Sequence, residues 1–145
     1  NRHDHAQTGA VMAFRILDKM GMDPADVAAV ITAIGHHDDS TAFPVNPVAA
    51  ALILADKTDV RRSRVRSKDR QHFDIHDRVN YAAERSDLSL ERDDGTITLT
   101  LTINTEFCAV MDYFEIFLER MLLCRRAAEH LGLQFKLVIN GLALL

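Results

Sequence analysis

The sequence predicts an α+β fold in which a helical core is followed by a small ββαβ unit. Apolar residues recur near helical spacing through most of the first 85 positions, and the period changes to two from Ser86 onward. A long amphipathic helical pattern then separates this alternating stretch from a last apolar strand. We therefore expect a helical domain over residues 1–85, and a ββαβ unit over residues 86–145 that packs on or beside it.

The first helix is expected at residues 5–20, with Gly21 as its left-handed stop. The second helix begins with Asp23 as its N-cap and Pro24 at its first position. It ends in a polar cluster, "GHHDD", at residues 35–39. The apolar residues of the first helix should form a buried stripe: Ala10, Val11, Phe14, Ile16, Leu17 and Met20.

The third helix opens at Asn46 and Pro47 and is apolar nearly all round, so we expect it at the centre of the domain. Asp56 is an acid within this helix. A buried carboxylate without a partner is costly, so Asp56 should be paired, hydrogen-bonded or metal-bound. A basic run, "RRSRVRSKDR", follows as a solvated helix end and loop, and Asp74 should cap a short helix through Ala83.

The ββαβ unit begins with a hairpin whose turn is Asp94-Gly95. The second strand places four apolar residues on one face and its threonines on the other: Ile97, Leu99, Leu101 and Ile103. A long helix over residues 106–131 and a third strand over residues 134–140 complete the unit, and the phenylalanines at 107, 114 and 117 should lie in its core.

Composition limits the function classes. The chain is 48% hydrophobic, which argues against global disorder, and its net charge of -4 argues against nucleic acid as a partner of the whole surface but not against a local basic patch. Cys108 and Cys124 are expected on one helix, roughly 24 Å apart, so they cannot bridge and a reduced, cytoplasmic setting is favoured. No apolar run approaches the roughly 18 residues that a membrane span needs, and no signal peptide is visible.

His5, His37 and Asp56 lie in or at the ends of three successive helical segments. Imidazole and carboxylate are ligands for divalent metals of intermediate hardness, so packing of the helices could create a metal site. Other interpretations stay open: His5 as a surface residue, His37 as a helix C-terminal residue favoured by the macrodipole, and Asp56 as an ion-pair partner.

The pattern "H…GA…L…MG…V…AI..H" followed by "A.ILADK.D" resembles the later two-thirds of the HD superfamily of metal-dependent phosphohydrolases. Members have an all-helical core and the ligand order His, His-Asp, His, His, Asp. The resemblance implies that His5, His37 and Asp56 bind a divalent ion (Mn, Fe, Ni, Zn, Co or Mg). It also implies hydrolysis of a small phosphorylated molecule such as a nucleotide, with Asp56 and Lys57 as catalytic residues.

The first histidine and the His-Asp doublet of the superfamily should lie upstream of His5 and are not in this chain. His3-Asp4 is too close to His5 to serve, and His76-Asp77 comes in the wrong order and fits the first turn of a capped helix. We therefore expect that the chain is a fragment of a longer protein, with a degenerate site as the alternative.

Arg61, Arg62 and Arg64, together with Lys57, are candidate phosphate contacts, because guanidinium binds phosphate oxygens in a bidentate manner. The alternative is a solvated charge run that also binds nearby acids. Three acidic residues could orient ligand histidines or be plain loop acids: Asp38, Asp39 and Asp59.

Two further function classes remain. A non-catalytic sensor would use the same pocket for ligand binding and associate through the ββαβ tail, whose exposed strands indicate a homodimer. Nucleic-acid binding would use the basic run at residues 61–70, but the acidic net charge and the lack of exposed aromatic residues count against it.

Overall fold

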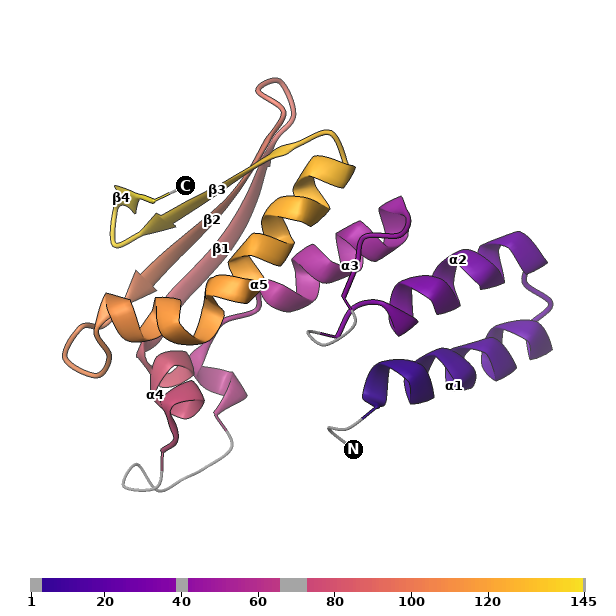
Figure 1. Cartoon of the computed structure of the whole chain (residues 1–145), viewed down its shortest axis with the longest axis horizontal. Helices are drawn as coiled ribbons and strands as arrows, with labels where there is room; N and C mark the ends of the chain where they lie inside the picture. Colours follow the sequence, from indigo (N-terminus) through magenta and orange to yellow (C-terminus); the bar gives the residue numbers. More distant parts are fainter. Residues whose placement is uncertain (1–3, 39–41, 66–72, 145) are drawn as a thin grey trace.

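The structure is a computed structural model that describes residues 4–38, 42–65 and 73–144 (Figure 1). The helical part contains α1 (His5–Lys19), α2 (Pro24–Gly35), α3 (Pro47–Lys57), the 3-10 turn η1 (Arg62–Arg64) and α4 (Ile75–Ala82). The remainder contains β1 (Ala83–Glu91), β2 (Thr96–Ile103), α5 (Val110–His130), β3 (Gln134–Ile139) and β4 (Leu142–Ala143). The predicted α+β class is confirmed, including the ββαβ order of the tail.

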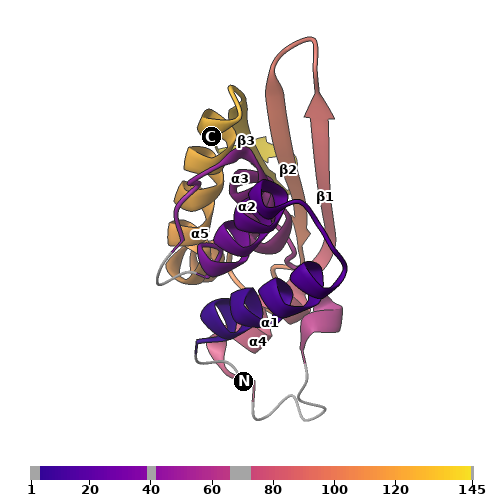
Figure 2. The ribbon, with the colours of Figure 1, turned by 90° about the vertical axis from the view of Figure 1, so that its right-hand side faces the viewer.

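The strands form one mixed sheet in the order β1-β2-β3-β4. β1 and β2 are an antiparallel hairpin, β3 runs parallel to β2 after the α5 crossover, and the short β4, which was not expected, turns back along β3. Helix α5 lies against one face of this sheet (Figure 2). The threonines of β2 alternate with its buried apolar residues and therefore belong to the opposite face. The hairpin turn uses a left-handed glycine, Gly95, with φ of 61°.

One hydrophobic core joins the sheet, α5, α3 and α4. The four expected apolar residues of β2 are all buried in it, as are Phe117 and Met121 of α5. Ile53 and Leu54 of α3 belong to the same cluster. The core therefore extends to both sides of residue 85, and the division into domains at residues 1–85 and 86–145 stays a prediction.

Helix ends follow the capping residues of the sequence. The side chain of Asp23 accepts a hydrogen bond from the Ala25 amide at 2.8 Å, and Asn46 accepts one from Ala49 at 2.7 Å. Asp74 accepts one from the Asp77 amide at 2.7 Å, which places His76-Asp77 in the first turn of α4 as expected. These short contacts determine where each helix begins.

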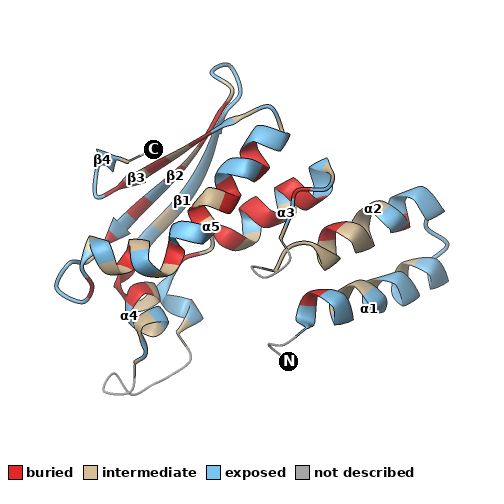
Figure 3. Cartoon of the chain, in the orientation of Figure 1, coloured by how far each residue is buried: buried red, intermediate tan, exposed pale blue. Residues whose placement is uncertain are grey.

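The predicted buried stripe of the first helix is wrong (Figure 3). Val11, Phe14 and Met20 are 61%, 46% and 72% exposed, and Ile16 is exposed as well, while Ala10 and Leu17 are half-buried. The described part of α1 buries a single residue fully, Ala6. The reason is that α1 packs on α2 through a narrow side that includes Ala6 and Gly9, and its larger exposed apolar residues lie outside this contact.

Three smaller expectations also change. Helix α3 lies between α2 and α5 as predicted, but it is not buried all round, because Val48 on its outer side is 48% exposed. Helix α5 begins at Val110, so Cys108 precedes it, and both cysteines are buried. Phe107 is 42% exposed and packs its ring on Tyr81 instead of entering the core.

No helix among the described residues is long and apolar enough to cross a membrane.

Asn140 closes the end of β2 and yields a stability prediction. It has a left-handed φ of 50°, and its side chain bonds both the amide and the carbonyl of Ile103, at 2.8 and 3.0 Å. We expect Asn140→Gly to lower the free energy of unfolding by about 1 kcal/mol, through loss of these bonds. Asn140→Ala should cost about 1 kcal/mol more, because alanine disfavours positive φ. Urea denaturation measures the free energy of unfolding of both variants. Equal values for Asn140→Gly and Asn140→Ala would show that the positive φ does not destabilise the alanine variant.

Candidate metal centre

Two of the three predicted ligands lie side by side. The Nε2 atoms of His5 and His37 are 3.2 Å apart, and the ring planes meet edge to face at 80°. His5 is the first residue of α1, and His37 lies just after the end of α2. The two imidazoles are therefore brought together by the packing of these helices, although they are 32 positions apart in the chain.

Small residues allow α1 and α2 to approach closely enough for this contact. A Cβ atom at Gly9 would lie 3.3 Å from the Cγ2 atom of Ile34, which is tighter than an ordinary contact. Gly35 faces Ala10 in the same way, with 3.9 Å between an added Cβ and the alanine methyl. His5 and Gly9 are four residues apart and so share one side of α1. The glycine and the histidine thus act on the same helix–helix contact.

The backbone of α2 orients its terminal histidines. The Nδ1 atom of His37 is 2.6 Å from the carbonyl oxygen of Ile34, and Nδ1 of His36 is 2.9 Å from that of Thr32. A carbonyl oxygen can only accept, so both Nδ1 atoms must carry the proton. In neutral His37 the Nε2 atom then presents a lone pair toward His5. A backbone carbonyl on the second ring nitrogen is the usual support of a metal-binding histidine.

The separation of the two Nε2 atoms fits a shared metal ion. Two nitrogens bound to one tetrahedral zinc at about 2.0–2.1 Å lie about 3.3 Å apart, close to the 3.2 Å between His5 and His37. The same distance also suits a hydrogen bond from His5 to His37 in the metal-free protein. Metal binding requires a lone pair on both Nε2 atoms, so His5 would then carry its proton on Nδ1.

Asp56 does not join the histidines. Its Oδ2 atom is 2.8 Å from Nζ of Lys57, and its side chain is 34% exposed, whereas that of Lys57 is 4% exposed. No group of three histidine, cysteine or acidic residues with metal-binding geometry occurs among the residues that the structure describes. Asp56 is paired, as expected of an acid in this helix. Its partner is Lys57, which the sequence offered as a phosphate contact. The lysine itself is buried and not at the surface.

The basic run is largely satisfied by nearby groups. Asp59 binds Arg61 through its Oδ1 atom at 2.7 Å and Arg64 through its Oδ2 atom at 3.1 Å. The side chain of Arg62 donates to the carbonyl of Tyr81 at 2.8 Å and lies over the tyrosine ring, 4.4 Å from its centroid. The sequence does not predict the contact between Arg62 and Tyr81, because these residues are 19 positions apart and no local spacing relates them. Part of the sequence interpretation lies outside the described residues: His3, Asp39 and residues 66–70 of the basic run.

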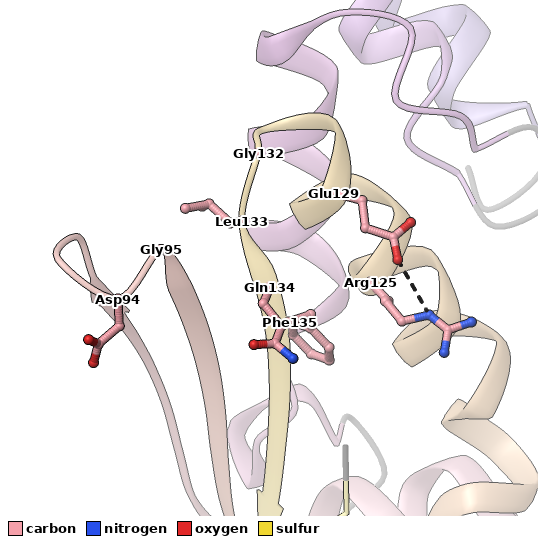
Figure 4. A pocket seen from close by; sticks show the side chains of 8 residues that line it. All are labelled: Asp94, Gly95, Arg125, Glu129, Gly132, Leu133, Gln134 and Phe135. Atoms are coloured by element: carbon pink, nitrogen blue, oxygen red, sulfur yellow. Dashed lines mark ion pairs between the residues drawn. The ribbon is translucent and has the colours of Figure 1, made fainter.

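A separate surface hollow of about 600 Å³ lies between the tip of the hairpin and the end of α5 (Figure 4). Its lining is mixed: Asp94, Gly95, Arg125, Glu129, Gly132, Leu133, Gln134 and Phe135. Arg125 approaches Glu129 at 3.9 Å, and Asp94 extends away from both. The lining of the hollow contains no histidine, and the hollow lies at the end of α5 away from α4 (Figure 1). It is therefore not part of the site formed by His5 and His37.

The thiol of Cys108 and the phenol of Tyr113 are buried, and neither adds an ionised nucleophile. Burial, followed by the nearby charge of Asp112, raises the pKa of the Cys108 thiol. Burial also raises the pKa of Tyr113 well above its ordinary range, and its hydroxyl donates to the sulfur of Met121 at 3.3 Å. Both groups therefore stay protonated at neutral pH. Neither Cys108 nor Tyr113 is therefore an ionised nucleophile at neutral pH.

The ring orientation yields a direct test. We expect nitrogen NMR of the neutral protein to show His36 and His37 as Nδ1–H tautomers, because each Nδ1 faces a carbonyl oxygen. Adding zinc should shift the Nε2 resonance of His37 and leave that of exposed His76 in place. An Nε2–H tautomer at His37 would contradict the described orientation.

No family model, curated protein or solved structure matches this chain. The HD resemblance therefore rests on the quoted residues, and the reaction it implies is treated below as a proposal.

Proposed function

We propose that His5 and His37 are ligands of a divalent metal ion in a phosphohydrolase that acts on a small phosphorylated molecule such as a nucleotide. The observation that best supports this proposal is the 3.2 Å approach of the two Nε2 atoms. The HD resemblance implies the reaction class, and the helix packing supplies a rigid base for two of its ligands.

Each helix has a defined role in this proposal. α2 holds the His37 ring through the Ile34 carbonyl, which fixes its tautomer and increases the basicity of Nε2. α1 brings His5 to the same point through the close contact at Gly9. A bound divalent ion would supply a water molecule ionised near neutral pH and would neutralise phosphoryl charge.

Asp56 and Lys57 would enter the site by a rearrangement. Asp56 can become a third ligand if its carboxylate turns away from Lys57, and this side chain is only partly buried. The exposed arginines Arg61 and Arg64 can bind a phosphate by exchanging it for the carboxylate of Asp59. The predicted catalytic and phosphate-binding roles of these residues belong to the same proposal.

A second function is supported by the ion pair of Lys57 with Asp56. Because the buried ammonium already neutralises this carboxylate, the chain could bind a metal or ligand through its histidines without hydrolysing anything. This is the sensor or binding-module function. It differs from the enzyme in one measurable respect: metal is bound, and phosphate esters are not cleaved.

Histidine variants test the metal centre. Removing a residue that only hydrogen-bonds to a metal ligand weakens metal binding by about 10–100-fold, so removing the ligand itself should weaken it at least as much. We expect His5→Ala and His37→Ala each to lower zinc or manganese affinity by more than about tenfold, measured by titration calorimetry and metal analysis. His76→Ala is the matched control, because this histidine is exposed on α4. The same proteins are assayed for phosphate release from a panel of nucleotides.

The outcomes separate the two functions. Metal-dependent phosphate release that is lost in both histidine variants supports the enzyme. Metal binding without release from any nucleotide supports the binding module. A parent chain whose metal affinity equals that of both histidine variants would remove the basis for either.

The helix contact can be tested apart from the ligands. Gly9→Leu places a large side chain where a single Cβ already lies 3.3 Å from Ile34, so α1 must move away from α2. We expect zinc affinity to fall by about tenfold or more, since overpacking costs about 1–3 kcal/mol. Thr8→Leu adds the same side chain at a neighbouring exposed position and should leave the affinity unchanged. Equal affinities in the two variants would contradict the role of Gly9.

A further inference from the structure

β1 is an edge strand with one unpaired side. It bonds to β2 in a regular register from Arg85 to Glu91, and a bulge interrupts the register before Arg85. Figure 2 shows β1 at the margin of the sheet, with β2 on its inner side. The regular part therefore offers a row of free backbone donors and acceptors along its outer side, which is a template for another strand.

The side chains of this edge do not oppose strand addition. Ser86, Leu88 and Leu90 share the face of Leu99, on the side of α5, and the two leucines of β1 are 41% and 49% exposed. Proteins commonly protect an edge with proline, lysine or an inward-pointing charge, and the regular part of β1 has none of these. Its charged residues all lie on the other face.

The sequence of β1 is complementary to itself in one antiparallel register. Leu88 is the central residue of the regular part, so a two-fold axis at Leu88 pairs every position from Arg85 to Glu91. In this register Arg85, which already forms an ion pair with Asp87 of its own strand, lies opposite Glu91 of the second copy at both ends of the paired segment. Asp87 lies opposite Ser89 of the second copy, and the two Leu88 side chains meet at the axis. Opposite charges and apolar side chains directly across a strand pair are stabilising.

Neighbouring registers are less favourable. An axis at Asp87 sets this acid against itself, and an axis at Ser89 sets Asp87 against Glu91. Axes farther along leave few regular residues to pair. Glu91 already accepts hydrogen bonds from the hydroxyls of Ser89, Thr96 and Thr98. These bonds, led by that from Ser89, lower the pKa of Glu91, so it enters the favoured pairing as an anion.

We propose that two copies of this chain associate through their β1 strands, antiparallel about a two-fold axis at Leu88, to form one continuous sheet. The Arg85–Glu91 pairs set the register, and burial of Leu88 and Leu90 contributes the apolar area. This interface is independent of the histidine pair, which lies on α1 and α2.

Sedimentation velocity over a range of concentrations tests the interface. The parent chain should shift from 16.3 kDa toward twice that mass as concentration rises. Leu88→Lys places two ammonium groups at the axis and should remain monomeric at every concentration. Leu142→Lys is the matched control, because Leu142 is an exposed leucine on β4 at the other edge of the sheet, and it should behave as the parent. Circular dichroism checks that each variant is folded.

A charge exchange tests the register. Arg85→Glu and Glu91→Arg should each weaken dimerisation by about tenfold, and the double variant should restore it, because the opposite charges meet again with reversed sign. A parent chain that is monomeric throughout, or a dimer that survives Leu88→Lys, would overturn the β1 interface. If the double variant does not restore dimerisation, the proposed register is wrong.

Discussion

The contact between α1 and α2 brings together the two histidines of the proposed metal centre. Small residues, Gly9 and Ala6 on α1 and Gly35 on α2, bring the helix axes close, and the close approach sets His5 against His37. Neither helix contributes to the cluster of buried residues that joins α3, α4, α5 and the sheet. The histidine pair thus depends on one helix–helix contact, whereas the ββαβ unit is supported by the whole core. Local opening should occur most readily where buried apolar contacts are few, which here is at α1.

The sequence predicts local structure well where the cause is local. Capping by Asp23, Asn46 and Asp74 involves atoms within three residues of the cap, so their positions could be read from the chain. The change of period at the hairpin likewise reflects only the alternation of side chains along a strand. The two-residue β4 was missed because so short a segment has no measurable period.

Burial was predictable only where a second element covers the residue. The apolar residues of α1 recur near helical spacing, but periodicity does not say whether another element packs against them. In this structure the large apolar residues Val11, Phe14, Ile16 and Met20 are exposed. The same limit applies to Phe107, whose ring rests on Tyr81 at the surface. The pairing of His5 with His37 could be anticipated because the resemblance supplied a long-range relation that spacing alone does not contain.

Lys57 shows why the surroundings of Asp56 were harder to predict. The spacing that selects Asp56 does not reveal that the next side chain is buried with its ammonium on the same carboxylate. A cation at that position already supplies the charge compensation that a metal would bring, and two cations at one carboxylate repel each other. Recruitment of Asp56 therefore requires that Lys57 give up this contact, and a buried ammonium loses more by doing so than an exposed one. The histidine pair of the proposed centre is consequently in place without any rearrangement, whereas the carboxylate joins it only if the contact with the lysine is released.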